Sequence, residues 1–122
     1  MKNGKHLIID AYNCFSPSLR EEGVIKKVLY DITDLIKLRP LSEAMIFEVT
    51  EDMLDKEGSG LTGGIIFMES HFTFHAFPEM AYFSADIYSC KNFDHDRVVT
   101  YIDQVFRPLR LDQNVILRGT AL

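Results

Sequence analysis

Residue types that take part in covalent and acid–base catalysis are concentrated in one short stretch of this 122-residue chain. Residues 69–79 read Glu-Ser-His-Phe-Thr-Phe-His-Ala-Phe-Pro-Glu, and Cys90 follows on the next predicted strand. Together a hydroxyl, two imidazoles, carboxylates and a thiol can supply a nucleophile, a general base and a proton donor. Alone, each has an ordinary structural role, as a strand hydroxyl, a half-buried histidine or a small core thiol. Only the ordered set points to chemistry.

Two strands are expected to position these groups. Residues 65–68 are apolar, and polar and apolar residues alternate over 71–76, which predicts one strand over 65–76 with His71, Thr73 and His75 on one face. Residues 78–80 predict a turn, and 82–90 predict a returning strand that pairs antiparallel with the first.

Further strands are expected at 6–12, 44–49 and 115–117, because these segments are short, apolar and rich in β-formers. The acidic, Gly-rich segment 51–64 predicts a loop. The order strand, helix, three strands, helix, strand predicts a single α+β domain over 1–122. We expect a two-layer sandwich, with an antiparallel sheet and two helices packed on one face.

The two helices are predicted from apolar residues at three- and four-residue steps. The first covers 21–37 and ends before Pro40, after a turn at 13–18. Asp94 is expected to cap the second helix, which ends before Pro108.

Composition and charge narrow the classes of function. The chain is 47% hydrophobic and 25% charged, which is typical of a globular domain. Its net charge is −5 with scattered basic residues, so binding to nucleic acid is not expected. The apolar run after His6 is too short for a signal peptide or a membrane span, which predicts a cytoplasmic protein without a membrane segment. Nine Phe and five Tyr suggest aromatic surface buried against another subunit.

The cysteines and histidines give no sign of a disulfide or a metal site. Cys14 and Cys90 are far apart in a chain that looks intracellular, so both are expected to be free thiols. With the four histidines they form no recognisable metal-ligand spacing, and no metal is expected.

The ordered set resembles the self-processing segment of bacterial and archaeal S-adenosylmethionine decarboxylases. That family carries Glu-Ser-His, then Thr-x-His, then an aromatic residue before Pro-Glu, and Asp and Cys on the next strand. The opening 4–10, Cys14 and the order of elements agree as well, so the resemblance covers essentially the whole chain. The matching residues here are Glu69-Ser70-His71, Thr73-Phe74-His75, Phe77-Pro78-Glu79, Asp86 and Cys90.

The resemblance implies that the serine is the precursor of a cofactor. Ser70 would attack the carbonyl of Glu69 to form an ester, and a nearby base, His75, would then drive its elimination. Thr62 stands where the family usually has a serine that assists this processing. The chain would be cut between Glu69 and Ser70 into 1–69 (β chain) and 70–122 (α chain), which begins with a covalent pyruvoyl group.

The resemblance also implies the roles in turnover. The pyruvoyl group would form a Schiff base with a small-molecule substrate and draw the electrons released with carbon dioxide. Cys90 would return a proton to carbon, since a free thiol is still largely protonated at neutral pH. Phe77 would supply a stacking face and Glu79 would bind a polar part of the substrate. Small members of the family form homodimers with active sites near the interface.

The substrate expected first is S-adenosylmethionine, for spermidine synthesis. Two departures bear on it: Phe77 replaces the family's usual tryptophan, and 52–57 lacks the aromatic residue of a usual His-x-Phe. The carboxylates of this segment could instead bind a guanidinium or ammonium group, so L-arginine or L-ornithine is the alternative substrate. A non-catalytic α+β regulatory or oligomerisation module is the alternative of another class.

Overall fold

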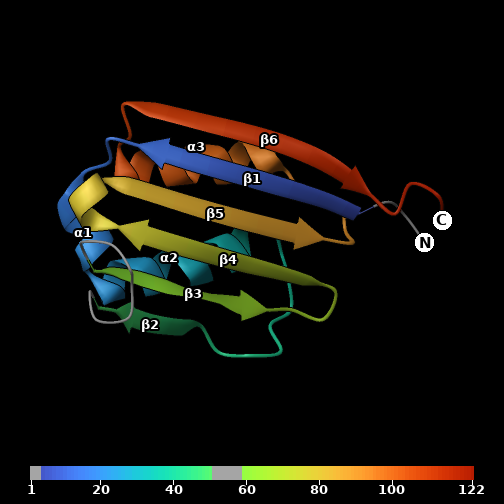
Figure 1. Cartoon of the computed structure of the whole chain (residues 1–122). Coiled ribbons are helices and arrows are strands. Elements are labelled where there is room, and N and C mark those ends of the chain that lie inside the picture. Colours follow the sequence, from blue (N-terminus) through green and yellow to red (C-terminus); the bar gives the residue numbers. More distant parts are fainter. Residues whose placement is uncertain (1–3, 51–58) are drawn as a thin grey trace.

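Residues 4–50 and 59–122, which the computed structural model describes, form a six-stranded antiparallel sheet with three helices on one face (Figure 1). The segment 52–57, expected to bear on substrate choice, therefore lies outside the described residues. In chain order the elements are β1 (Gly4–Tyr12), α1 (Ser16–Arg20), α2 (Glu22–Leu35), β2 (Met45–Val49), β3 (Gly60–Ile66), β4 (Ser70–Phe77), the short 3-10 helix η2 (Pro78–Met80), β5 (Tyr82–Ser89), α3 (His95–Phe106) and β6 (Arg110–Arg118).

The strands lie in the order β2-β3-β4-β5-β1-β6, and every neighbouring pair is antiparallel. β1, the first strand of the chain, thus lies between β5 and β6, the last two. The predicted α+β two-layer sandwich is confirmed, with α1 as an additional short helix on the same face. The other face of the sheet carries no helix of the described ranges, and we call it the open face (Figure 1).

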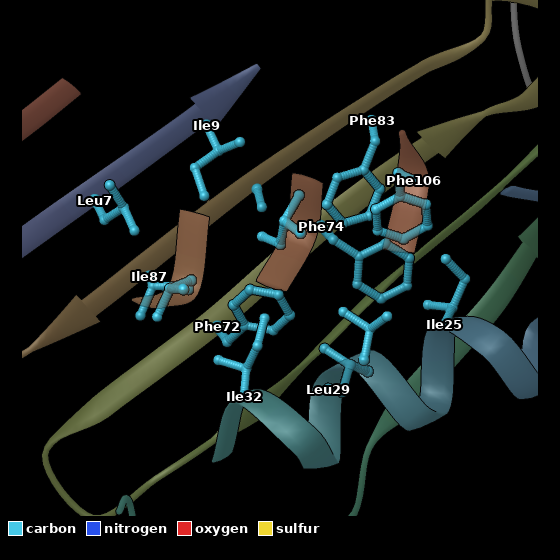
Figure 2. Close-up of a cluster of buried hydrophobic side chains, with 14 of the residues drawn as sticks. Leu7, Ile9, Ile25, Leu29, Ile32, Phe72, Phe74, Phe83, Ile87 and Phe106 are labelled. Atoms are coloured by element: carbon cyan, nitrogen blue, oxygen red, sulfur yellow. The ribbon is translucent and has the colours of Figure 1, made fainter. Parts of the chain in front are cut away.

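The core lies between the sheet and the helices. Alternate residues of β4 and β5, such as Phe72, Phe74 and Phe83, point towards α2 and α3 and are at most 1% exposed. They meet Leu29 of α2 and Phe106 of α3, and the rings of Phe83 and Phe106 stack at 4.4 Å between centroids (Figure 2). Truncating one of these phenylalanines to alanine typically costs about 3–5 kcal/mol, so this cluster fixes the two faces of β4 and β5.

The prediction of a loop over 51–64 was wrong for residues 60–64, which belong to β3, and its part over 51–58 lies outside the described residues. Glycine is frequent in turns, but here it allows neighbouring strands to approach closely. A Cβ at Gly63 would overlap the carbonyl oxygen of Met45 on β2, and one at Gly64 would overlap that of Phe72 on β4. The glycines therefore pack the sheet rather than break it.

The prediction of one strand over 65–76 was also wrong, because the chain turns at 67–69 between β3 and β4. Residues 65–68 are all apolar and include no residue type that favours turns, so the sequence gives no sign of the turn at 67–69. The turn is held by the Phe67 N–H, which donates to the Ser70 carbonyl at 2.9 Å, and by the Met68 N–H, which donates to the Arg39 carbonyl at 3.1 Å. It places Glu69 and Ser70 at the tip of a hairpin.

The helical predictions need smaller corrections. The helix predicted over 21–37 covers Glu22–Leu35, and Lys37 already has a left-handed backbone with φ of 56°. Part of the turn predicted at 13–18 forms α1, and the last strand extends over Arg110–Arg118 rather than 115–117 alone. The Asp94 cap is confirmed, since its side chain accepts a hydrogen bond from the Arg97 N–H. Among the described residues, no helix has the length and hydrophobicity to cross a membrane.

Candidate active site

The peptide bond between Glu69 and Ser70 lies at the tip of the β3–β4 hairpin, against the end of β5. The Glu69 carbonyl accepts a hydrogen bond from the backbone N–H of Cys90 at 3.3 Å. A backbone N–H aimed at a carbonyl oxygen stabilises the negative charge that develops there when the carbonyl carbon is attacked. The backbones of Glu69, Ser70 and Cys90 therefore lie together, while the Cys90 side chain lies on the open face with Tyr88 and the Ser70 side chain lies on the helix side.

The Ser70 side chain points to the helix side of the sheet and is only 7% exposed. Its hydroxyl donates to Ser89 Oγ at 2.7 Å, and the Lys91 N–H donates to the same oxygen at 2.9 Å. Sequence reasoning missed Ser89. The available signal was its period-two spacing from the apolar residues Ala85 and Ile87, which places a hydroxyl on the buried face of β5.

A cavity of about 140 Å³ adjoins this peptide bond. Both Glu69 and Ser70 contribute to its wall, together with the basic residues Arg39 and Lys91. The bond therefore borders an open space on the helix side of the hairpin tip, next to two positive charges.

His75 and Thr62 form a second pair of predicted residues, on the open face. They are directly opposite in the β3–β4 register, and Thr62 Oγ1 lies 2.9 Å from His75 Nδ1. When Nδ1–H donates to this hydroxyl, the lone pair of Nε2 is free to accept a proton. The contact orients the imidazole as the predicted processing base requires.

The structure does not bring His75 to Ser70 within one chain. The two side chains lie on opposite faces of β4, since Ser70 faces the helices and His75 is exposed on the open face. Because a strand rises about 3.3 Å per residue, their five-residue separation puts the two Cα atoms about 16 Å apart. Within one chain, His75 is therefore too far from Ser70 to act directly as the predicted processing base.

Cys90 follows β5 directly and lies on the same side as Tyr88. Its Sγ is 3.3 Å from Tyr88 Oη, and this hydrogen bond is the largest cause of a raised pKa of Tyr88. Sequence reasoning missed Tyr88 as a partner of the thiol. The other cysteine, Cys14, is buried, and burial raises its pKa to about 11, so it stays protonated. Both cysteines are free thiols.

Phe77 belongs to a row of stacked rings on the open face. Its ring stacks on Tyr82 at 5.7 Å between centroids with an interplanar angle of 13°, and Tyr82 stacks on Tyr12 at 5.3 Å. His75 lies at the other side of Phe77, at 6.1 Å. Burial, followed by a hydrogen bond to Asp10, raises the pKa of Tyr82 to about 12, so this ring stays neutral. Of this row, Phe77 and His75 were predicted as site residues from the sequence, whereas Tyr82 and Tyr12 were not.

Glu79 lies in η2, at the end of the sheet beyond this row. One of its carboxylate oxygens is 3.5 Å from Arg20 Nη1 on α1, and both side chains are about half exposed. Exposed pairs of this kind contribute little to stability, so the carboxylate stays available to a polar ligand group.

The fold and this site define a small α+β domain with a buried serine hydroxyl beside its own peptide bond at a hairpin tip. The sequence model described as S-adenosylmethionine decarboxylase matches residues 5–119. The chain therefore belongs to the S-adenosylmethionine decarboxylase family. This confirms the resemblance and the predicted enzyme class, a decarboxylase, in preference to a non-catalytic module.

Individual relatives agree over nearly the full length. A protein of Clostridium botulinum strain Langeland named S-adenosylmethionine decarboxylase proenzyme is 31% identical over 121 residues, which covers 96% of this chain and 95% of the relative. A protein of the same name from Methanococcus aeolicus is 27% identical over 98% of this chain and 96% of the relative. The crystal structure of adenosylmethionine decarboxylase from Aquifex aeolicus has the same fold, with a TM-score of 0.75 and 23% identity over 98% of this chain and 93% of its own.

Proposed function

We propose that this chain cleaves itself between Glu69 and Ser70 and then acts as a pyruvoyl-dependent decarboxylase of S-adenosylmethionine. The observation that carries the proposal is the hydrogen bond from the Cys90 N–H to the Glu69 carbonyl, beside a Ser70 hydroxyl held in place at the same peptide bond. The relatives' name, a proenzyme, agrees with such a step.

Processing follows from these groups. Ser70 Oγ attacks the Glu69 carbonyl carbon, the C–N bond breaks, and the hydroxyl proton ends on the Ser70 nitrogen, which gives an ester. A base then removes the Ser70 Cα proton, and Oγ leaves as part of the Glu69 carboxylate. Water converts the resulting dehydroalanine to the keto group, with release of ammonia.

We assign the base to His75 of a second copy of the chain. The separation of about 16 Å within one chain rules out direct contact. In a dimer with open faces stacked about 10 Å apart, the partner's His75 would approach the Ser70 Cα proton from the open face, while the Ser70 side chain points to the helices. His75 is exposed on the open face, as are the apolar side chains of Phe47, at 61% exposure, and Ile116, at 48%. A face of this kind is suited to burial against its own copy, in a homodimer.

In turnover the pyruvoyl group supplies a carbonyl that takes up electrons as carbon dioxide leaves. The residues around it bind the substrate and control protons. Cys90 holds the proton that returns to the substrate carbon, and Tyr88 keeps the thiol in place. The row of Phe77 and Tyr82 offers a flat, neutral surface on which a nucleobase can stack.

This row favours S-adenosylmethionine over L-arginine or L-ornithine, since neither amino acid has a nucleobase. The amino acids remain the alternative, because the acidic residues 51–57 lie outside the described part of the chain. Carbon dioxide release measured in parallel with the three substrates decides between them. Activity on an amino acid alone would overturn the first choice.

Intact mass of the purified protein tests the processing step. Wild type should give two fragments divided between residues 69 and 70, the later one blocked at its N-terminus. Ser70→Ala should remain intact, because it lacks the attacking oxygen. A single intact wild-type chain under all conditions contradicts the proposal.

Mixed dimers test whether His75 acts on the other copy. Ser70→Ala and His75→Ala are each expected to remain uncleaved alone. When the two are co-expressed with different tags, the His75→Ala chain should be cleaved by the histidine of its Ser70→Ala partner. If the mixed dimer forms and neither chain is cut, the assignment to a second copy is wrong.

A further inference from the structure

Ser89 is a completely buried hydroxyl, and its side-chain partner is the serine that the proposed processing consumes. It lies directly opposite Ser70 in the β4–β5 register and is 0% exposed. Its oxygen accepts hydrogen bonds from Ser70 Oγ at 2.7 Å and from the Lys91 N–H at 2.9 Å. The other inward-facing residues of β5 are apolar: Phe83, Ala85 and Ile87.

We propose that Ser89 is a positioning residue for self-cleavage, which holds the Ser70 hydroxyl in one rotamer beside the Glu69 carbonyl. This inference rests on the proposed function. An unconstrained serine side chain samples three staggered rotamers. Holding Ser70 in one of them pre-organises its hydroxyl for attack and lowers the entropic cost of reaching the reactive geometry.

The surroundings of Ser89 explain how it can do this. Because Ser89 is inaccessible to water, its hydroxyl has no competing solvent partner, and the Lys91 N–H fixes its position from the backbone. Engaging the Ser70 proton directs the lone pairs of Ser70 Oγ away from Ser89. The next residue, Cys90, contacts the carbonyl under attack. Two consecutive residues at the end of β5 therefore hold the two reacting groups.

Ser89 itself is unchanged in the reaction. The bond from Ser70 Oγ to the Glu69 carbon forms, the C–N bond breaks, and the proton passes to the Ser70 nitrogen. Removing the Ser89 hydroxyl should therefore slow ester formation without removing any reacting atom.

Three variants test the inference by the rate of self-cleavage, followed by intact mass in freshly synthesised full-length protein. Ser89→Ala should be slower than wild type by roughly ten- to a hundredfold, and Ser89→Thr, which restores a hydroxyl, should recover most of the rate. The matched control is Thr33→Val, which removes a hydroxyl that is 5% exposed and donates within α2, to the Leu29 carbonyl at 2.7 Å, rather than to Ser70. It should cleave at the wild-type rate.

Each outcome decides the inference. Wild-type cleavage by folded Ser89→Ala overturns it, and so does equal slowing in Ser89→Ala and Thr33→Val, because loss of stability would then explain both. If Ser89→Ala does not fold, Ser89→Cys replaces it, with similar size and a weaker acceptor, and must also be slow. A wild-type chain that never cleaves removes the proposed function, and this inference with it.

Discussion

The backbone N–H of Cys90 donates a hydrogen bond to the carbonyl oxygen of Glu69, at 3.3 Å. The side chain of the same residue points to Tyr88, with 3.3 Å between Sγ and Oη. One residue therefore serves the two proposed stages through different atoms: its backbone contacts the bond to be cut, and its thiol serves turnover. This division makes the two stages separable by mutation.

Cys90→Ala should keep self-cleavage and lose turnover. The substitution leaves the N–H in place but removes the proton donor, and general acid catalysis typically contributes about a hundredfold or more. Intact mass measures cleavage, and carbon dioxide release per mole of cleaved chain measures turnover. Normal turnover in this variant would contradict the role given to the thiol.

Thr62→Val should slow processing at the elimination step, by about tenfold, because His75 loses the hydroxyl that orients Nδ1. The ester should then accumulate, and hydroxylamine should cut it at Glu69. Thr62→Ser should behave as wild type. Thr73→Val is the matched control, since Thr73 is exposed on the same face of β4. An equal effect of both valine substitutions would argue against orientation of His75 by Thr62.

Gly63→Ala should destabilise the fold by about 2 kcal/mol or more, because the new Cβ meets backbone that cannot move aside. Gly23→Ala is the opposite control: a Cβ added at Gly23 would have no neighbour within 4 Å, and alanine favours the helix by up to about 1 kcal/mol. Urea unfolding of both in the Ser70→Ala background, which keeps the chain intact, measures the difference. Equal stabilities would refute the close approach of β2 and β3.

Asp31→Asn should destabilise the protein in a pH-dependent way. Hydrogen bonds from Lys27, at 2.6 Å, and from Tyr101 on α3, at 2.5 Å, lower the pKa of Asp31. A lowered pKa means that the folded state favours the charged form, so this stabilisation is complete above the ordinary carboxyl range near pH 4 and is lost as pH falls through the lowered value.

We expect a difference of about 1 kcal/mol between the parent chain and the Asp31→Asn variant at pH 7, which shrinks towards pH 3. Urea unfolding across this range, again in the Ser70→Ala background, measures it. Asp34→Asn, an exposed carboxylate on the same helix, is the control. A difference that stays constant with pH would contradict the assigned cause.

The sequence predicted most of the fold because strands with two different faces carry a visible period. His71, Thr73 and His75 share the open face as the alternation indicates. The hairpin tip escaped prediction because 65–68 is apolar throughout, and β3 because glycine marks both turns and close packing. The elements that were missed contain residues whose backbone conformation is decided by tertiary packing rather than by residue type.

The candidate site was predictable in its residues and less so in its geometry. The ordered motif located Glu69, Ser70 and Cys90, and the structure brings their backbones together. Ser70 and His75 are five residues apart, and an odd separation puts two side chains on opposite faces of a strand. The period-two rule thus predicts that they do not meet within one chain, but the prediction of His75 as the processing base did not take it into account. Period two places Ser89 on the buried face of β5, but its partner Ser70 is known only from the structure.

The position of β1 between β5 and β6 determines the order of folding and the proposed cleavage. A cut at the hairpin tip leaves β1, β2 and β3 on one fragment and β4, β5 and β6 on the other, and in the sheet these two sets are interleaved. After the proposed cleavage the fragments would stay together, since separation must break the β3–β4, β5–β1 and β1–β6 ladders. Once unfolded, however, they have lost the covalent link that guided their assembly. The proposed self-cleavage therefore requires that the chain fold first, and it would make maturation a one-way step.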